Sequence, residues 1–323
     1  MEQPVDATPY SPECEADWDR FVEQSRNGNI FHTRRFLSYH PPGRFEDASL
    51  MLRRGGRLVG VFPAAWREEP GLGRVLVSHP GASHGGPVFG PKVSAATVHA
   101  AVAAILRHAR EAGAAAVQLR PAPHLFHQPA MEELDFALHF HGFEVARAEL
   151  TTYVALDPGA GDLLGTYATG CRGAVRKALK SGLEAGESDD FAGFWGILTE
   201  HLGQRHGVRP THSLEEILTL RRVLPGRIRL FAAARGGELL GGTVVFVCTP
   251  RAAHTFYMAS RREAWALSPM NLAVHAALEW ARGQGIGRVN FGVSTPDRQT
   301  VNWGLLDFKE SFGGRGACRL TYR

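Results

Sequence analysis

Two stretches of the chain repeat the same order of apolar and polar positions. Leu50–Ala64 reads LMLRRGGRLVGVFPA, and Leu230–Phe246 reads LFAAARGGELLGGTVVF. Each consists of an apolar run, an Arg-Gly-Gly turn and a second apolar run. Because glycine adopts the positive φ angles that a tight turn requires, each stretch is predicted to form a β-hairpin.

A second pair of stretches joins the end of a helix to the start of a strand. Ala109–Pro121 (AREAGAAAVQLRP) and Ala281–Val293 (ARGQGIGRVNFGV) both place a glycine between an amphipathic segment and an apolar run. A glycine at this position ends a helix by adopting a left-handed conformation. The helices themselves are expected through Ala96–Ala112 and Met270–Arg282.

Each half of the chain also opens with two predicted helices. They are Ala16–Ser25 and Arg34–Tyr39 in the first half, and Asp190–Gln204 and Leu214–Val223 in the second. The order helix, helix, three strands, helix, strand therefore occurs twice, and the first half is expected to close with the strand Phe143–Leu156. This repeat predicts an α/β fold (α+β, with mixed sheets) built as two similar domains, residues 1–150 and 151–323. In one version of this prediction, residues 316–323 return as a strand to the first domain. The alternative is chance similarity in a chain rich in glycine and alanine.

Composition and charge narrow the class of protein. The 323 residues are 44% hydrophobic and 21% charged, which fits a globular chain with a sizeable core. Apolar stretches such as Thr243–Cys248 are far shorter than the roughly 20 residues of a membrane helix, and the acidic N-terminal segment does not resemble a signal peptide. The widely spaced cysteines (Cys14, Cys171, Cys248 and Cys318) indicate reduced thiols and a cytoplasmic location. The pI of about 9.0 is compatible with phosphate-bearing ligands.

Several short motifs follow one another along the chain. They are the aromatic residues Trp18, Phe21, Phe31 and Phe36, SHPGASHGGPVFG (Ser78–Gly90), CRGAVRKALKSG (Cys171–Gly182), Arg205–Gly207, Pro269–Trp280, NFG (Asn290–Gly292) and GLLDFKESFG (Gly304–Gly313). This ordered set resembles the FemAB-like, or Fem-type, branch of the GNAT acyltransferases over nearly the whole chain. The resemblance implies two tandem GNAT-like domains, with the first on the acceptor side and the second on the acyl-donor side.

N-acyl transfer requires an amine, an activated acyl donor and hydrogen-bond donors for the developing oxyanion. Thioesters and aminoacyl esters are already activated, so the reaction requires no nucleophilic side chain, and none of the four cysteines stands in a catalytic context. The resemblance implies direct attack in a ternary complex, with the strand His254–Ser260 supplying a backbone N–H. Tyr257 is a candidate proton donor to the leaving group, and the alternative is an ordinary core aromatic.

The loop that would hold the donor departs from ordinary GNAT enzymes. Those enzymes bind the pyrophosphate of coenzyme A with a Q/R-x-x-G-x-G/A loop, whereas Arg261–Asn271 reads RREAWALSPMN. Ser268 is a suitable N-cap and Pro269 a suitable first helical residue. The missing glycines favour aminoacyl-tRNA over acyl-CoA as the co-substrate, with no tightly bound cofactor. The candidate donor-binding residues are Arg172, Arg176, Lys177, Arg261, Arg262, Ser268 and Asn271, with a merely solvated basic face as the alternative.

The remaining candidate site residues come mainly from the resemblance. It implies that Lys309 lies close to the acyl donor or to an acceptor phosphate, where its charge would stabilise negative oxygen; a surface lysine is the alternative. Asp297 is a candidate base or ammonium ligand. The candidate acceptor-binding residues are Arg205, His84, Gly85, Gly86, Trp303 and Asn290. The alternative for Arg205 is a cation that only stabilises the end of a helix. The alternative for the Gly-Gly loop, the part of Ser78–Gly90 that contains Gly85 and Gly86, is an ordinary turn.

The fifteen histidines raise the question of a metal. The closest pairs are His124 with His127 and His139 with His141, and no carboxylate or cysteine completes a set at ligand spacing, so no metal site is expected. The sequence therefore predicts a cytoplasmic N-acyltransferase without a membrane span, acting on an amine-bearing small molecule or precursor with tRNA as a partner. The alternatives are an acyl-CoA-dependent N-acetyltransferase and a non-catalytic binding module on the same scaffold.

Overall fold

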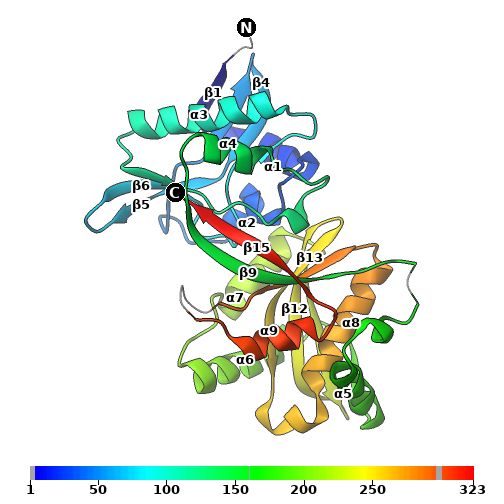
Figure 1. Ribbon diagram of the computed structural model, residues 1–323. Coiled ribbons are helices and arrows are strands. Elements are labelled where there is room, and N and C mark those ends of the chain that lie inside the picture. Colours follow the sequence, from blue (N-terminus) through cyan, green and yellow to red (C-terminus); the bar gives the residue numbers. More distant parts are fainter. Residues whose placement is uncertain (1–3, 160, 296–299) are drawn as a thin grey trace. The chain divides into compact units, whose positions relative to one another are not determined.

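The computed structural model describes residues 4–159, 161–295 and 300–323, with the backbone alone for Arg205 and His206. The chain divides into two compact units. Unit 1 comprises residues 1–149 and 318–323, and unit 2 comprises residues 150–317. Figure 1 shows the course of the chain through the elements of each unit.

Unit 1 contains two four-stranded sheets, with strand orders β1-β3-β4-β7 and β2-β5-β6-β8. The strands are β1 (Val5–Pro9), β2 (Glu46–Asp47), β3 (Leu50–Arg54), β4 (Arg57–Phe62), β5 (Ala64–Glu69), β6 (Gly73–Ser78), β7 (Val88–Phe89) and β8 (Ala116–Gln118). The helices are α1 (Glu15–Gln24), α2 (Arg34–Leu37), α3 (Ala95–Glu111) and α4 (Glu133–Phe140), with short 3-10 turns that include η3 (His124–Phe126).

Unit 2 is built around one seven-stranded sheet of order β10-β11-β12-β13-β14-β9-β15. Its strands are β9 (Val145–Ala155), β10 (Glu184–Ser188), β11 (Ile228–Arg235), β12 (Glu238–Thr249), β13 (Ala252–Ser260), β14 (Arg288–Val293) and β15 (Arg315–Tyr322). Its helices are α5 (Thr169–Lys180), α6 (Phe191–His206), α7 (Leu214–Val223), α8 (Pro269–Gly283) and α9 (Trp303–Glu310), and the 3-10 helix η5 (Arg262–Leu267) precedes α8.

The predicted repeat is confirmed in its hairpins and in the strand after the long helix, although six strands (β2–β7) lie between α2 and α3 where only three (β11–β13) lie between α7 and α8. Both hairpins form, and both carry a bulge at the same place counted from the Arg-Gly-Gly turn, so that Val59 and Leu240 are the extra residues. In unit 2 the strand before α8 pairs in parallel with the strand after it, β13 with β14, and in unit 1 the earlier strand β6 pairs in parallel with β8, which follows α3. The two halves therefore share topology and local irregularities, as a duplicated fold would.

The last strand of each half, β9 and β15, contributes residues to both units. β9 continues from unit 1 into unit 2, where it pairs antiparallel with β14. β15 follows β9 in the same sheet, and its end returns to unit 1, where Tyr322 pairs with Leu119 beyond β8. The main-chain groups of Glu144 and Arg323 continue this antiparallel pairing with two mutual hydrogen bonds of 2.9 Å.

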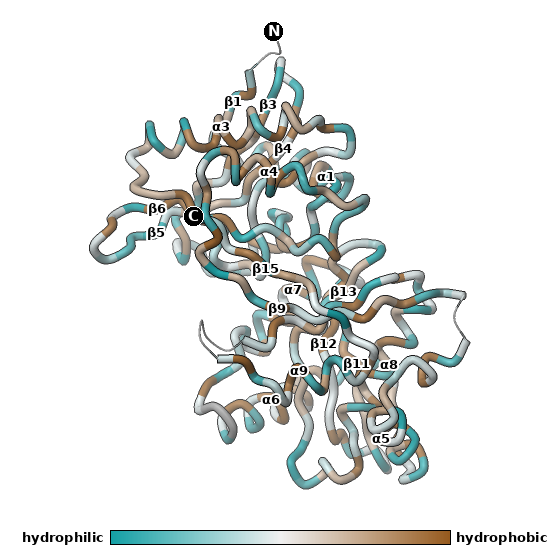
Figure 2. Tube along the Cα trace, viewed as in Figure 1, coloured by the Kyte–Doolittle hydropathy of each residue, from teal (hydrophilic) through white to brown (hydrophobic). Residues whose placement is uncertain are grey.

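Each unit has its own apolar core. In unit 1, α3 buries Val98, Ala101, Val102 and Ile105, which lie three to four residues apart on one face of the helix. Apolar and polar colours accordingly alternate along α3 in Figure 2. In unit 2, α8 buries Leu272, Val274, Ala277, Leu278 and Ala281 in a separate core cluster.

Candidate functional site

The parallel ladder between β13 and β14 is short. It joins Ala252–His254 to Arg288–Asn290, and no further β13–β14 pair occurs among the described residues. Both strands become irregular where the ladder ends: Phe256 is the extra residue of a bulge in β13, and β14 is irregular between Asn290 and Val293. The edge of β13 that faces away from β12 is thus without a ladder partner from Thr255 onward, within the described chain.

Asn290 holds the irregular end of β14. Its side-chain Oδ1 accepts hydrogen bonds from Thr151 Oγ1 at 2.6 Å and from the main-chain N–H of Gly292 at 3.2 Å, and its main-chain carbonyl accepts one from His254 Nδ1 at 3.1 Å. Gly292 has φ 73° and packs on the His254 ring, where a Cβ would lie 3.1 Å from Cε1. Glycine is therefore required here. The substrate-binding role of Asn290 stays a prediction.

Lys309 lies in α9 and is 1% exposed, so the alternative of a surface lysine is wrong. Its ammonium donates to the main-chain carbonyls of Gly292 (2.8 Å) and Val293 (2.7 Å) and to Ser294 Oγ (3.0 Å). These three bonds use all three protons of a charged lysine. Burial lowers the pKa of Lys309 to about 7. The lysine therefore fixes the end of β14 and places a titratable positive charge beside the unpaired part of the sheet.

Tyr257 lies one residue after the bulge in β13, and its hydroxyl meets a buried histidine that the sequence analysis missed. The main-chain N–H of His212 donates to the tyrosine oxygen at 3.0 Å, which directs the hydroxyl proton toward His212 Nδ1 at 2.7 Å. Burial raises the pKa of Tyr257 to about 12, so the hydroxyl stays protonated. The only local signal for His212 was its place directly before Ser213, which caps α7 with Glu216.

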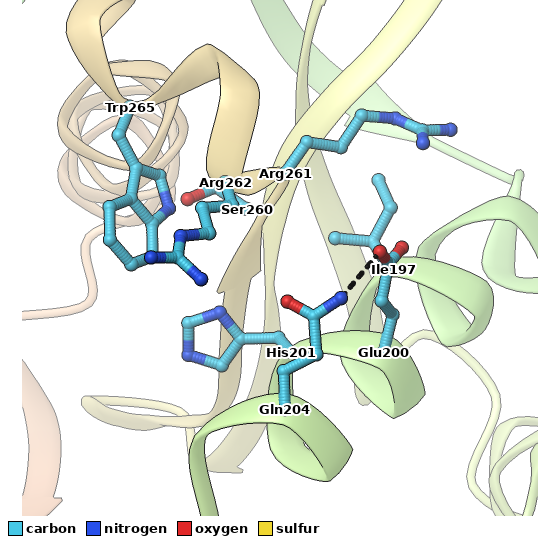
Figure 3. Close-up of a pocket in the computed structure, with 8 residues that line it drawn as sticks. All are labelled: Ile197, Glu200, His201, Gln204, Ser260, Arg261, Arg262 and Trp265. Atoms are coloured by element: carbon cyan, nitrogen blue, oxygen red, sulfur yellow. Dashed lines mark hydrogen bonds between the residues drawn. The ribbon is translucent and has the colours of Figure 1, made fainter.

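The predicted donor residues Arg261 and Arg262 line a pocket of about 390 Å³ between α6 and the start of η5 (Figure 3). In Figure 3 the Arg262 side chain extends toward the rings of His201 and Trp265, whereas Arg261 points the other way. Arg261 Nε donates to the Leu239 carbonyl at 2.9 Å. Exposed cationic and aromatic groups in one hollow suit a ligand that carries phosphate and a planar ring.

The start of α8 differs from the prediction at Ser268. This residue occupies the N-cap position but has φ 58° and ψ 44°, and its side chain makes no capping hydrogen bond. It is the only non-glycine residue with positive φ in the described chain. The expected serine cap is wrong because Ser268 also closes η5, donating its N–H to the Trp265 carbonyl at 3.0 Å, and this turn requires the left-handed conformation.

Asn271, in the first turn of α8, contacts α5 by donating to Cys171 Sγ at 3.6 Å. The apolar face of α5 buries Cys171, Val175 and Ala178. The predicted donor residues on this helix lie outside that face: Arg172 is half-buried, and Arg176 and Lys177 are exposed. Their donor-binding role stays a prediction.

The Gly-Gly loop of unit 1 is held by buried histidines. His32 Nδ1 accepts from the Asn29 main chain, so Nε2 donates to the Gly85 carbonyl at 2.9 Å. His84 is buried against aromatic rings and lies 3.4 Å from Asn29 Nδ2, and Gly86 has φ 83°. Burial lowers the pKa of His32 to about 4, so the ring is neutral at pH 7. The acceptor role of this loop stays a prediction.

Three predicted site residues remain to be placed: Trp303, Arg205 and Asp297. Trp303 begins α9 and is 67% exposed. Arg205 lies in α6, but its side chain is outside the described structure, and Asp297 lies outside the described residues.

The sequence analysis expected no carboxylate near the histidine pairs, and this is wrong for His124. His124 lies 3.0 Å from a carboxylate oxygen of Glu132 and 3.2 Å from one of Asp135. The sequence hid this set because η3 and the first turn of α4 must pack together before the three side chains meet.

Comparisons with known proteins bear on the whole chain. Residues 168–309 match the model of an acetyltransferase (GNAT) domain family. FemX is 17% identical with a TM-score of 0.72, covering 98% of this chain and 96% of FemX. L-PGS from Bacillus licheniformis is 12% identical with a TM-score of 0.57 (99% and 92% covered), and a tandem GNAT protein from the clavulanic acid biosynthesis pathway is 14% identical with a TM-score of 0.55 (98% and 97% covered).

At these identities the solved structures show a shared fold. No curated protein matches the sequence. Within the described residues, no helix has both the length and the apolar character needed to cross a membrane. The chain therefore shares the fold of FemX and of a tandem GNAT protein, and its residues 168–309 match the acetyltransferase (GNAT) domain family.

Proposed function

We propose that this acyltransferase joins an activated acyl or aminoacyl group to an amine by direct attack in a ternary complex. The amine nitrogen attacks the acyl carbon, the bond to the leaving oxygen or sulfur breaks, the amine loses a proton and the leaving group gains one. No covalent enzyme intermediate is needed because the donor is already activated. Unit 2 is proposed to hold the donor, and unit 1 the acceptor.

The observation that carries this proposal is the early end of the β13–β14 ladder. A strand edge without a ladder partner offers main-chain N–H groups to an acyl oxygen, and a bulge at Phe256 redirects the main chain at this point. The buried charge of Lys309 at the end of β14 favours negative charge nearby. Tyr257, whose hydroxyl stays protonated, is the proposed proton donor to the leaving group, and in that step its proton turns away from His212 Nδ1.

We propose aminoacyl-tRNA as the donor. The segment Arg261–Asn271 has no glycine at which main-chain N–H groups could approach a pyrophosphate closely. It offers instead the exposed Arg262 and Trp265, and α5 presents further basic side chains. Guanidinium groups and aromatic rings suit the phosphates and bases of a single-stranded tRNA end.

The second candidate is an acyl-CoA-dependent N-acetyltransferase. The match of residues 168–309 to an acetyltransferase domain favours it. In this candidate the phosphates of coenzyme A would bind at the start of α8, where Ser268 does not cap the first N–H groups.

Calorimetry with acetyl-CoA and with charged tRNA, each titrated into the full chain, separates the two candidates. We expect charged tRNA to bind and acetyl-CoA to bind no tighter than about high-micromolar. A low-micromolar isotherm for acetyl-CoA, with none for charged tRNA, would establish the second candidate. The variant Arg262→Ala should weaken binding of the true donor, and Arg57→Ala, on the exposed turn of unit 1, serves as the matched control.

A further inference from the structure

Arginines gather on one face of the strands that meet at the end of β15 in unit 1. Leu119, directly after β8, pairs with Tyr322, and both side chains belong to the apolar core of unit 1. Because successive side chains of a strand point to opposite faces, Arg120 and Arg319 lie on the face that looks away from this core. The two guanidinium groups therefore share one polar face of unit 1.

One buried carboxylate holds two of the arginines on this face. Glu149, on β9, is 5% exposed. Its Oε1 accepts from Arg147 at 2.6 Å, and its Oε2 accepts from Nε and Nη2 of Arg319 at 3.0 and 2.7 Å. Arg147 uses one terminal nitrogen for this contact, and its Nε is buried without a hydrogen-bond partner in the described chain. A buried donor of this kind calls for an acceptor that the chain itself does not supply.

Arg120 has a fixed main chain and a side chain without a bonded partner. Its N–H donates to Ser78 Oγ at 2.9 Å, and its carbonyl accepts from the N–H of Gly85 at 2.8 Å, so the residue borders the Gly-Gly loop. The half-buried guanidinium forms no hydrogen bond or ion pair with any residue that the structure describes. Burial lowers the pKa of Arg120, and the positive charges of Arg319 and Arg147 lower it further. Arg120 is thus a cation among cations, with no anion bonded to it.

Each oxygen of a second carboxylate is taken by a different arginine. Glu69, at the end of β5, accepts from Arg67 through Oε1 and from Arg323 through Oε2, the latter at 2.6 Å. Arg67 also donates to Gln118 Oε1 at 3.2 Å, two residues before Arg120. Among the described residues, Glu69 and Glu149 are the two carboxylates that pair with this group of five guanidinium groups, which are those of Arg67, Arg120, Arg147, Arg319 and Arg323. The positive charge on this face therefore exceeds the negative charge that is bonded to it.

We propose that Arg120, Arg147 and Arg319 form a binding site for a small oxyanion of the phosphate class. Arg120 supplies a guanidinium that can donate two parallel hydrogen bonds, and Arg147 supplies its unpartnered Nε. Arg319 stays on Glu149 and adds positive charge. A phosphate dianion has enough oxygens to accept from both arginines, and it neutralises more of the excess charge than a single carboxylate does.

The position of Arg120 beside the Gly-Gly loop narrows the ligand. The site holds either a free phosphate ion or a phosphate group of a small molecule that binds at this loop. The inference goes beyond the proposed acyl transfer, because the site uses none of the side chains assigned to that reaction.

The competing account is a structural ion-pair network, in which the arginines only hold Glu149 and the Arg120 side chain is solvated. In that account, phosphate binds no better than another anion at the same ionic strength. The two accounts also differ for Glu149→Gln, whose amide oxygen still accepts a hydrogen bond while the charge that competes with phosphate is lost. A phosphate site should bind its ligand more tightly in this variant, whereas a structural network should only become less stable.

The test is titration of the full chain with inorganic phosphate by calorimetry, with sodium chloride added to keep the ionic strength constant. We expect saturable binding of one phosphate per chain, an affinity about 10-fold or more lower in Arg120→Gln, and a higher affinity in Glu149→Gln. Arg57→Gln removes one positive charge from an exposed arginine beside the Arg-Gly-Gly turn of unit 1. It is the matched control and should bind phosphate like the unmodified protein.

Glycerol phosphate and acetate are titrated in the same way. Tighter binding of the ester assigns the site to a phosphate group carried on a small molecule, and tighter binding of inorganic phosphate assigns it to the free ion. Arg120→Gln removes no side-chain hydrogen bond within the described chain, so it should fold, and melting temperatures of all variants are compared first. The proposal is overturned if the unmodified protein binds phosphate no more tightly than Arg120→Gln, if Arg57→Gln lowers the affinity equally, or if acetate binds as tightly as phosphate.

Discussion

The two units share an element order but differ at one strand. In unit 2, β12 runs unbroken from Glu238 to Thr249 and pairs with both β11 and β13. The equivalent chain in unit 1 is split into β4 and β5 at Pro63, and the two parts pair in different sheets. Counted from the Arg-Gly-Gly turns, Pro63 corresponds to Val244, which stands directly before the register shift opposite Phe256. Proline has no N–H for a ladder, so unit 1 breaks where unit 2 only bulges.

The buried polar groups differ as well. Unit 1 buries His32, His79 and His127, and burial lowers the pKa of each to about 4, so these rings are neutral at pH 7. Unit 2 buries Lys309 beside the unpaired edge of its sheet. Neutral buried histidines such as His32 hold loops in place, whereas a buried cation favours a developing anion. The comparison therefore supports the proposal that the chemistry takes place in unit 2.

Removing the buried charge should have the largest effect. We expect Lys309→Met to lower turnover by about 10²–10³, as for loss of one preorganised electrostatic donor. Lys309→Arg should recover only part, because a planar guanidinium does not occupy the position of a compact ammonium. Turnover is measured with the donor identified by calorimetry, and melting temperature is measured in parallel. A folded Lys309→Met variant with full activity would remove the assignment of chemistry to this lysine.

The same lysine predicts a pH dependence. With a pKa of about 7, Lys309 is charged at lower pH and loses its charge as the pH rises through 7. If the charge stabilises the transition state, the lysine-dependent part of turnover falls over this range, and Lys309→Arg shows a flatter profile. Turnover that rises through pH 7 in the unmodified protein, but not in Lys309→Arg, would indicate a base instead.

A proline can test whether the unbroken strand matters to unit 2. Val244→Pro removes a ladder donor from a fully buried central strand, and we expect a loss of about 3 kcal/mol or more in the free energy of unfolding. Pro63→Val in unit 1 is the matched control and should change stability by less than about 1 kcal/mol. Urea unfolding followed by tryptophan fluorescence measures both. If both variants change the free energy of unfolding by a similar small amount, the unbroken β12 is not needed for the stability of unit 2.

Removing the tyrosine hydroxyl should have a smaller effect on rate. We expect Tyr257→Phe to lower turnover about 10²-fold if the hydroxyl donates a proton to the leaving group. A donor with a more acidic leaving group should depend less on this proton, so it should partly restore the rate of the variant. If Tyr257→Phe loses stability but keeps its turnover, the hydroxyl serves only to hold His212.

The stability of unit 1 should fall in acid because of its buried histidines His32, His79 and His127. Between pH 6.5 and about 4 the unfolded chain binds a proton at each of these three residues and the folded chain does not. The free energy of unfolding therefore falls as the pH falls through this range. His79→Asn should reduce the slope by about 1.4 kcal/mol per pH unit, because asparagine Oδ1 can still accept from Gly81 but does not titrate. Urea unfolding at several pH values measures the slope. An unchanged slope would mean that His79 does not bind a proton on unfolding.

The smallest expected effect concerns the basic face of α5. Lys180→Met should weaken donor binding and reduce its salt dependence by about one unit of slope, while turnover at saturation stays nearly the same. Donor affinity at several salt concentrations checks this. A fall in saturated turnover would place α5 in the chemistry and not only in binding.

The sequence by itself determined the elements and their repetition. The turn glycines and the apolar periodicity predicted α3, α8 and both hairpins closely, because these signals act over a few residues. The motif that contains Lys309 could be recognised for the same reason. What Lys309 contacts could not be predicted, since its acceptors lie on β14, in another part of the unit.

Tertiary structure decided the rest. The pairing of β9 with β14 and of Tyr322 with Leu119, the contact of His212 with Tyr257 and the contact of His124 with Asp135 join residues from 11 to well over 100 positions apart. Ser268 shows the same limit on a short scale, because two helical turns meeting at one residue overrode its preference as a cap. Local propensity selects each element, but only the packing of several elements determines which polar groups meet and which stay without a partner.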